Sequence, residues 1–567
     1  MREIYLKLRN NIILDSDLQL AEREIRSLFD SCKSITRADC ESAFQCLHKI
    51  HLLSNIREGQ VIGYAVSGNK IPMKRVLCLL SFIQEVWTFF EIENTDPAIA
   101  HSVDDAFCYI PLMTMSEFLY YTKTPSVEAA RRITLALALG SSADKDIQKS
   151  IDRVKTSAPH LHSFHTYKAK FFPRFVHSLI VSDVDVTKEN LKVCDPYVGS
   201  GTTLIESSLM GFESCGIDID ALSCFISQVK SDSLNIEGGL QPSPTDGLFA
   251  KVGKKKFVFP KEIRRKFERW GSLEEMETYQ KEISDELNTI DGEDSPYKEL
   301  HKIALSDALT RKFNVRMMGT GSGRFALEIG KTRLSSIIKS DMVNSLKGIA
   351  TIQTIKGLYG IETPSPIVIN GSATKRDIPN DSLDIIITSP PYIPASSGRE
   401  DYLVGKLTSL TALGLYNEDR IAKYQTDSVG SMGAVSEDLS GLPNAVVDLY
   451  NWLLKDELRS IKARPIVAYY RSLIESLKED KRTIKEGARI VYIIGKETVF
   501  YSSATKEILY KVECDKIFKE IALAAGLQIV DTIDIELDKK DNIARPRGSD
   551  KYYECAIVMC KNGSQAT

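Results

Sequence analysis

Short apolar runs alternate with longer amphipathic stretches from about residue 160 to the end of the chain. The apolar runs are four to seven residues long and end in polar residues, which is typical of buried strands. They predict strands at 191–195, 213–218, 367–370, 383–388, 489–495, 527–533 and 553–560. Helical stretches at about 203–211, 466–485 and 511–525 separate several of them. Such alternation indicates crossover connections and a mostly parallel sheet, and therefore an α/β fold.

This pattern divides the chain into four regions. Residues 1–150 are expected to form a separate N-terminal accessory domain, with a strand near its start, an amphipathic helix at 17–29 and further helices at about 38–50, 73–91 and 126–139. The Rossmann-like, mostly parallel seven-stranded sheet is expected in two parts, 160–228 and 366–562. Residues 229–365 separate its second and third strands, and this is too long for a loop. An inserted subdomain is therefore expected there.

The glycine-rich segment after the first predicted strand of the sheet is the strongest candidate for ligand binding. Its candidate residues are Asp195, Pro196, Gly199, Ser200, Gly201, Thr202 and Thr203. A glycine-rich turn lets the backbone approach a ligand, and the following helix N-terminus offers N–H groups. The next strand ends at Asp218, where an acidic residue can accept hydrogen bonds from ribose hydroxyls. These features predict a ligand that carries a ribose.

The surroundings of the glycines narrow this prediction. The chain has no Gly-x-x-x-x-Gly-Lys-Ser/Thr sequence, so a triphosphate cradle is unsupported. A dinucleotide site and a purely structural turn, with Asp195 as a cap, are the alternatives. A carboxylate is unfavourable beside a pyrophosphate, whereas it suits a ligand with a cationic amino-acid end. S-adenosylmethionine has such an end and is the expected cofactor.

A second polar segment, Thr388-Ser389-Pro390-Pro391-Tyr392, follows the strand predicted at 383–388. Together with Asp-Pro-Tyr-Val-Gly-Ser-Gly-Thr-Thr at 195–203, it resembles the motif pair of the S-adenosylmethionine-dependent amino-methyltransferases of DNA, particularly those that make N4-methylcytosine. Residues 164–173 are similar to the segment that packs over the cofactor in that family. The resemblance covers about residues 160–562.

The resemblance implies a role for individual residues. Phe171 would pack near the adenine of the cofactor, and Asp218 would hold the ribose. Ser372 stands where the family often has an aspartate that binds the adenine amino group, and it is shorter and uncharged. The residues that would line the methionine end are Asp195, Gly199 and Gly201.

The acceptor motif suits a weakly nucleophilic amine. The lone pair of the exocyclic amine of cytosine is conjugated into the ring, so an enzyme must orient it. Ser389 and a main-chain carbonyl can accept the amine hydrogens, and Pro390 and Pro391 stiffen the turn. Tyr392 offers a face on which the target base can stack. Direct transfer then requires alignment without a covalent nucleophile, and a base in duplex DNA would be rotated out of the stack.

Basic residues are concentrated in the first part of the expected insertion, with Phe257, Phe259, Phe267 and Trp270 interleaved. Basic side chains and stackable rings suit a phosphate backbone and unstacked bases, and a solvated helix face is the alternative. The order of donor motif, large insertion and acceptor motif also resembles the family arrangement in which the insertion is the target-recognition region. The residues expected to contact nucleic acid are Lys254, Lys255, Lys256, Arg264 and Arg265, with Arg399 after the acceptor motif.

The expected activity is methylation of an exocyclic amino group in DNA, at cytosine N4 first and adenine N6 second. A restriction-modification setting with a cognate nuclease or defence partner is expected. The tRNA guanosine-N2 methyltransferases, which have similar motifs, are the main alternative, with RNA as the partner. They generally have Asp before Pro-Pro-Tyr, where this chain has Ser389. A non-catalytic specificity subunit is a third reading, which the intact acceptor motif disfavours.

Composition adds bounds to this interpretation. The chain has 567 residues, of which 43% are hydrophobic and 26% charged, so two to four domains are expected. No apolar run approaches the roughly 20 residues that span a bilayer. A cytoplasmic protein without a membrane partner is therefore expected. Four histidines crowd 160–177, but no cysteine or carboxylate cluster completes a site near them, so no metal is expected.

Overall fold

The computed structural model describes most of the chain. The described residues are 4–12, 14–36, 39, 60–103, 105–140, 145–147, 160–167, 171–236, 256–293, 295–317, 325–393, 400–502, 505, 507–537 and 552–561. Among them, no helix combines the length and the apolar character needed to cross a membrane.

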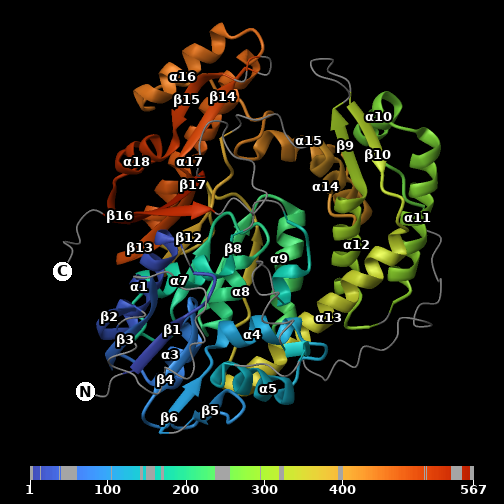
Figure 1. The fold of residues 1–567 in the computed structure, drawn as a ribbon. Helices are drawn as coiled ribbons and strands as arrows, with labels where there is room; N and C mark the ends of the chain where they lie inside the picture. Colours follow the sequence, from blue (N-terminus) through green and yellow to red (C-terminus); the bar gives the residue numbers. More distant parts are fainter. Residues whose placement is uncertain are drawn as a thin grey trace.

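A seven-stranded sheet lies at the centre of the molecule (Figure 1). Its strand order is β11-β8-β7-β12-β13-β17-β16. The first five strands pair in parallel, whereas β17 pairs antiparallel with both of its neighbours. This mixed sheet with covering helices confirms the α/β class. The strands are β7 (Lys192–Asp195), β8 (Glu213–Asp218), β11 (Ile367–Asn370), β12 (Leu383–Thr388), β13 (Ile484–Gly495), β16 (Leu527–Leu537) and β17 (Tyr552–Lys561), close to the bounds that the apolar runs predict.

The two faces of this sheet bury different apolar clusters. Ile385 and Ile387 of β12 belong to one cluster and Ile386 to the other, because successive side chains of a strand point to opposite faces. The first cluster includes residues of α7 (Pro173–Asp183), α8 (Thr202–Leu209) and α9 (Ala221–Ser233). The second includes residues of α16 (Asn444–Lys455), α17 (Ala463–Thr483) and α18 (Cys514–Ala524). Burial on both faces explains why the strands have continuous apolar sequences.

The N-terminal region forms a second sheet, with antiparallel pairs in the order β2-β3-β1-β4-β6-β5. The prediction of one helix over 73–91 is wrong, because a short helix is followed there by β4. The mostly apolar run at 76–83 continues from this helix into β4, so its periodicity does not separate the buried strand from a continued helix. The predicted helix at 38–50 lies outside the described residues, apart from Asp39. The elements are β1 (Ile4–Leu8), α1 (Asp15–Leu28), β2 (Phe29–Thr36), β3 (Val61–Asn69), α3 (Met73–Leu79), β4 (Ile83–Thr88), β5 (Ala100–Val103), β6 (Ala106–Tyr109), α4 (Leu112–Tyr121) and α5 (Val127–Ala138).

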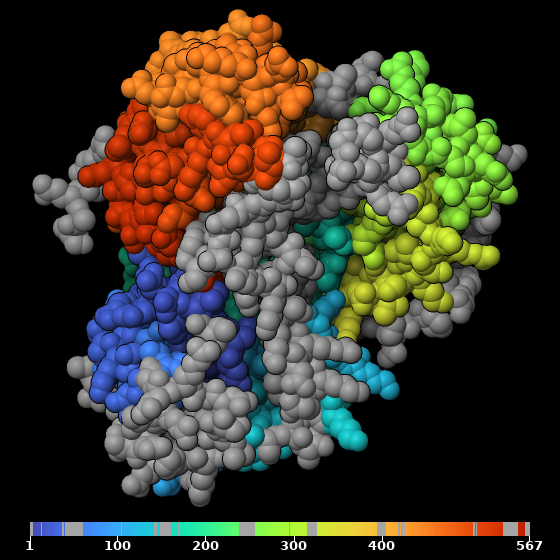
Figure 2. Space-filling view, turned by 45° about the horizontal axis from the view of Figure 1, so that its top comes forward, coloured from blue at the N-terminus to red at the C-terminus, as the bar shows by residue number. Residues whose placement is uncertain are grey.

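The N-terminal region packs directly on the central sheet region, as the blue and red surfaces show in Figure 2. Arg23 of α1 bonds to Asp183 of α7 at 3.1 Å and to Asp531 of β16 at 2.5 Å. The insertion also contacts the N-terminal region, because the hydroxyl of its Tyr359 donates to the Ile110 carbonyl at 2.6 Å. The first apolar cluster contains residues of both regions, so they share one core.

The insertion lies to the right of the central sheet in Figure 1. Its helix α12 packs against α13 and against α14, which follows the acceptor motif. The long helix α13 returns to the N-terminal region, where it contacts α4. The insertion consists of α10 (Lys261–Trp270), α11 (Leu273–Asp291), α12 (Lys298–Lys312), β9 (Phe313–Met317), β10 (Phe325–Ile329) and α13 (Leu334–Tyr359). The other elements are η2 (His160–Ser163), α14 (Glu400–Ala412), α15 (Glu418–Asp427), η3 (Ser460–Lys462), β14 (Glu497–Tyr501) and β15 (Ile508–Glu513).

Candidate active site

A cavity of about 320 Å³ lies at the carboxyl ends of β7, β8 and β12. Both motifs line it, together with residues from the segment before β7 and from the region of α14 and α15. This is the edge at which open α/β sheets bind their ligands. The lining residues that the sequence predicts are Phe171, Asp195, Pro196, Gly199, Ser200, Thr202, Asp218, Ser372, Ser389, Pro390, Pro391 and Tyr392.

The glycine-rich turn has a backbone that requires glycine at two positions. Gly199 has φ 49° and Gly201 has φ 77°, in the left-handed region that other residues rarely adopt. Gly201 is the N-cap of α8, and a Cβ added to it would lie 3.0 Å from Ser227 Oγ. The Ser227 hydroxyl and the buried Lys230 ammonium donate to the carbonyls of Gly199 and Ser200 at 2.9 and 3.0 Å. Contacts from α9 therefore stabilise the turn.

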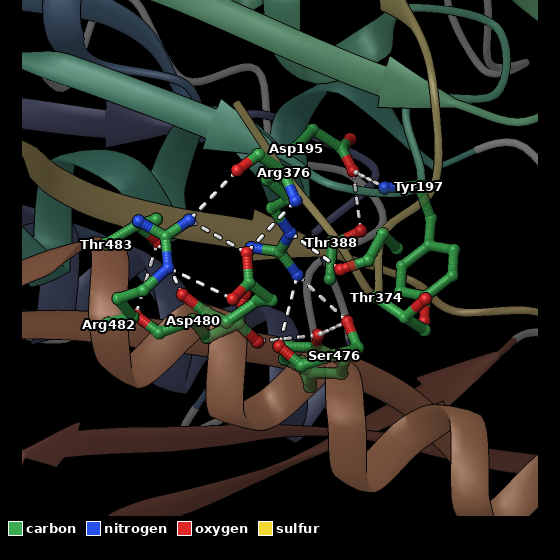
Figure 3. A network of polar contacts seen from close by, with 12 residues as sticks. Asp195, Tyr197, Thr374, Arg376, Thr388, Ser476, Asp480, Arg482 and Thr483 are labelled. Carbon is green, nitrogen blue, oxygen red and sulfur yellow. Dashed lines mark hydrogen bonds and ion pairs between the residues drawn. The ribbon is translucent and has the colours of Figure 1, made fainter. Parts of the chain in front are cut away.

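Asp195 joins the two motifs. Its carboxylate accepts hydrogen bonds from the Thr388 hydroxyl at 2.5 Å and the Tyr197 main-chain N–H at 3.1 Å (Figure 3). The Thr203 hydroxyl donates to its other oxygen at 2.7 Å. Only 1% of its surface is exposed. Burial raises the pKa of Asp195 to about 6, and the three donors oppose that rise. A buried carboxylate with three donors is held in one orientation at the floor of the cavity.

Asp218 lies at the end of the adjacent strand β8. Its two carboxylate oxygens accept from the main-chain N–H groups of Gly199 and Asp220 at 3.0 and 2.9 Å. Burial and the charge of Asp220 raise the pKa of Asp218 to about 7. A carboxylate has about four acceptor positions, so two remain for hydroxyl donors of a ligand.

A buried polar network lies beneath the cavity and connects it to α17 (Figure 3). Arg376 bonds to Asp480 at 2.5 Å, and neither side chain is exposed. The other Asp480 oxygen accepts from the Tyr492 hydroxyl at 2.7 Å, and Arg376 Nε donates to the Ala373 carbonyl at 2.8 Å. Since Ala373 lines the cavity, this ion pair stabilises its wall.

The acceptor motif begins where β12 ends. Ser389 is half-buried and Pro390 is buried, whereas Pro391 and Tyr392 are exposed. The Tyr392 hydroxyl donates to Glu554 Oε1 of β17 at 2.6 Å. Gly430 is so close that a Cβ there would lie 3.2 Å from the Tyr392 carbonyl. The motif is thus held between β17 and the segment after α15.

Two residues predicted for the donor site, Gly201 and Thr203, do not line the cavity, whereas Ser372 does. Thr203 does not line the cavity but holds Asp195, and Gly201 begins α8. The Ser372 hydroxyl lies 2.8 Å from that of Thr374 and accepts from the Thr374 main-chain N–H at 3.2 Å. Ser372 therefore forms a local turn at the cavity wall.

Several lining residues are absent from the sequence predictions. Tyr167 lies within the segment 164–173 that resembles the family, so that segment was the available signal. Lys406 of α14 pairs with Asp220 at 2.6 Å and donates to the Tyr424 hydroxyl at 2.6 Å. Tyr197 and Val198 lie within the donor motif, and Ile219, Asp220 and Ala373 lie next to the predicted Asp218 and Ser372. No motif marks the others, because they come from α9, α14, α15 and the segment after α15, which only the fold brings to this edge. The lining residues absent from the predictions, apart from Tyr167, are Tyr197, Val198, Ile219, Asp220, Ser223, Ala373, Lys406, Tyr424, Asp427, Ser428 and Val429.

Of the nucleic-acid candidates, the three described ones lie in or just before α10 and do not line the cavity. Lys256, Arg264 and Arg265 are exposed, and Arg264 lies 3.5 Å from Glu268. Lys254, Lys255 and Arg399 lie outside the described residues. The interleaved phenylalanines are not available for base stacking, because Phe257, Phe259 and Phe267 are buried and pack on one another. Trp270 is partly exposed, with Lys266 and Arg269 over its ring.

Two of the crowded histidines share one buried carboxylate. Glu206 of α8 lies 2.7 Å from His162 Nε2 and 3.0 Å from His177 Nδ1. Burial opposes the ionisation of Glu206, but the two histidine contacts outweigh it and lower its pKa to about 2. This cluster links η2 and α7 to the helix that starts at the glycine-rich turn.

The chain is similar in sequence to type II methyltransferases. Type II methyltransferase M.MjaII of Methanocaldococcus jannaschii is 35% identical over 99 residues, which are 18% of this chain and 18% of that protein. Type II methyltransferase M.MvaI of Kocuria varians is 23% identical over 377 residues, which are 61% of this chain and 79% of that protein. The chain thus spans less than a fifth of the first relative and about four fifths of the second.

Other comparisons add less. No family model matches the chain. A crystal structure of a S-adenosylmethionine-dependent methyltransferase from Methanosarcina mazei aligns with 66% of this chain and 93% of its own, at 9% identity. Its TM-score of 0.24 is too low to establish a common fold.

Proposed function

We propose that the protein transfers a methyl group from S-adenosylmethionine to an exocyclic amino group in DNA, with cytosine N4 as the first target. The observation that supports this most is the single cavity lined by both the glycine-rich turn and Ser-Pro-Pro-Tyr. The bond from Thr388, which precedes that motif, to Asp195 joins the two directly. Similarity to two type II methyltransferases also supports the reaction class.

The donor residues suit this cofactor. Asp195 offers a carboxylate to the cationic amino-acid end, and Asp218 has acceptor positions for the ribose hydroxyls. Phe171 provides an apolar surface for the adenine at the cavity wall. The volume falls in the range of small-molecule sites. When bound, S-adenosylmethionine supplies an electrophilic methyl group on a sulfonium.

The acceptor residues orient the amine. The Ser389 hydroxyl and a neighbouring carbonyl accept its hydrogens, which directs the nitrogen lone pair toward the donor side of the cavity. The Tyr392 ring, which is 43% exposed, presents a face to a base rotated out of a duplex. Alignment and exclusion of water then account for the rate, and the amine proton leaves to solvent.

DNA contact is assigned to the insertion. The exposed basic residues of α10 and the adjacent Lys256 would meet phosphates, and Trp270 is the aromatic residue of this segment with an accessible surface. A restriction-modification setting belongs to the same proposal, because both relatives are type II enzymes by name.

The test measures transfer directly. Purified protein is incubated with labelled S-adenosylmethionine and, separately, with unmethylated duplex DNA of high sequence diversity and with total tRNA. The nucleic acids are then digested and the methylated nucleoside is identified by mass. N4-methylcytosine in DNA is the expected product.

The other outcomes separate the alternatives. N6-methyladenine in DNA would retain the site and change its target base. N2-methylguanosine in tRNA would replace the DNA proposal by an RNA one. Cofactor binding without any product would favour a non-catalytic subunit, and the absence of cofactor binding would overturn the site assignment.

A further inference from the structure

We propose that Glu554 is a positioning residue of the acceptor site, which holds the Tyr392 ring in the orientation needed to stack on the target base. This role rests on the proposed function. The hydrogen bond from the Tyr392 hydroxyl to Glu554 Oε1, at 2.6 Å, is the observation that carries it. Neither the motifs nor the cavity lining includes Glu554.

The sheet explains why these two residues meet. Thr388 of β12 pairs with Tyr492 of β13, which in turn pairs with Ile557 of β17. Tyr392 lies four residues beyond Thr388, toward the ligand-binding edge. Because β17 runs antiparallel to β13, the residues before Ile557 approach the same edge, and Glu554 is the third of them. The reversed strand therefore places a carboxylate beside the acceptor motif.

The bond fixes the outer end of a ring that lies at the surface of the site. The Tyr392 side chain is 43% exposed, and its two side-chain torsions would allow several orientations in solvent. Glu554 is partly buried on a central strand of the sheet, where its position is fixed by pairs with Gly495 and Ile535. Burial raises the pKa of Glu554, and the Tyr392 hydrogen bond opposes the rise. A fixed acceptor at the far end of the ring leaves one preferred orientation.

A double-mutant cycle tests this role in the full-length protein. The variants are Y392F, E554A, E554Q and the double variant Y392F/E554A, and D534A is the matched control. Asp534 lies on the neighbouring strand β16 and pairs with Lys496 on the surface at 2.9 Å. The readouts are kcat and KM for DNA in the methyl-transfer assay, the Kd for S-adenosylmethionine and the Tm.

The expected results follow from the contact. Loss of orientation at a reacting centre costs on the order of 10- to 100-fold, so E554A and Y392F should each lower kcat by about that factor. The double variant should be no slower than either single variant, because both changes remove the same bond. E554Q keeps an acceptor oxygen and should stay within about threefold of the wild type. Cofactor Kd and D534A activity should be unchanged.

Other outcomes would overturn the role. Multiplicative losses in the double variant would show that Glu554 acts independently of the Tyr392 hydroxyl. An E554Q variant as slow as E554A, or one with a lowered Tm and weakened cofactor binding, would show a structural role. If the wild type itself methylates neither DNA nor tRNA, the proposed function fails and this role fails with it. If the wild-type protein transfers methyl groups and E554A has the same kcat, only the role of Glu554 is overturned.

Discussion

At the scale of single residues, the two carboxylates of the cavity combine burial with hydrogen bonding. Asp195 and Asp218 keep acceptor positions for a ligand, yet burial raises the pKa of each, to about 6 and about 7. Ionised forms are needed to attract an ammonium group and to accept from ribose hydroxyls. Cofactor binding therefore requires ionised carboxylates in a buried place that favours their protonated forms. The stability of the protein and its affinity for the cofactor should both depend on pH for this reason.

Replacing Asp195 by Asn is expected to stabilise the protein above neutral pH while weakening cofactor binding. A raised carboxyl pKa favours the folded state fully below the ordinary value of 3.8, and this stabilisation is lost as the pH rises through about 6. At pH 8 the ionised form therefore costs up to about 3 kcal/mol, and the asparagine variant should recover about 1–3 kcal/mol. Urea unfolding at pH 8 and pH 4 measures the difference.

Asp384 provides the control for this variant. It is partly exposed and pairs with Lys485 at 2.8 Å, so D384N should change the free energy of unfolding by less than about 1 kcal/mol. A D195N protein that is less stable than the wild type at pH 8 would contradict the expectation.

The affinity for S-adenosylmethionine is expected to fall as the pH is lowered from 8 to 5. Protonation removes the negative charge of Asp218 near pH 7 and of Asp195 near pH 6, and each step weakens attraction to donors of the cofactor. Calorimetric titration across this range measures the Kd. In D195N the step near pH 6 should disappear, and a Kd independent of pH in the wild type would argue against both assignments.

At the scale of elements, the seven strands of the central sheet lie close to the bounds that their apolar runs predict, whereas the N-terminal strand β4 does not. A strand buried on both faces has a short apolar run between turn residues, and this pattern is visible in the sequence. The glycine-rich turn also shows where the first of these strands, β7, ends. β4 follows the apolar helix α3 so closely that the two share one apolar run. The contact of Arg376, in the segment between β11 and β12, with Asp480 of α17 has no local sequence signal either, because the two residues are about a hundred positions apart.

Replacing Arg376 by Ala is expected to destabilise the protein by about 3–5 kcal/mol, because it leaves Asp480 charged and buried without its partner. Denaturant unfolding at pH 7.5 measures the loss. K478A, on the same helix, removes an exposed pair with Glu475 and should cost less than about 0.5 kcal/mol. Equal losses in the two variants would show that the buried network contributes little.

At the scale of the whole molecule, the N-terminal sheet and the central sheet share one apolar core, and the insertion contacts both regions through α13. Arg23 crosses the boundary to Asp183 and Asp531. Units that share a core lose stability together, so the two regions should not unfold separately.

A single cooperative transition is therefore expected for both regions. The three tryptophans, Trp87 in β4, Trp270 in α10 and Trp452 in α16, report on different regions. W270F/W452F keeps the N-terminal reporter, and W87F/W270F keeps the one beside the central sheet. Their fluorescence should change at the same denaturant concentration. In each variant, the fluorescence midpoint is compared with the midpoint of global unfolding measured by circular dichroism. A fluorescence midpoint that differs from the global midpoint of the same variant would show independent units.

The sequence by itself determined the local features of the site. Gly199 and Gly201 are needed wherever such a turn occurs, and the apolar runs before Asp195, Asp218 and Ser389 are long enough only for strands that end at these residues. The tertiary structure decided which distant residues meet. The reversed direction of β17 brings Glu554 to Tyr392, 162 positions away, and the packing of α14 on the insertion brings Lys406 to Asp220. It also showed that the phenylalanines beside the basic residues form a core. Such contacts depend on strand order and helix packing, which no local pattern of residues specifies.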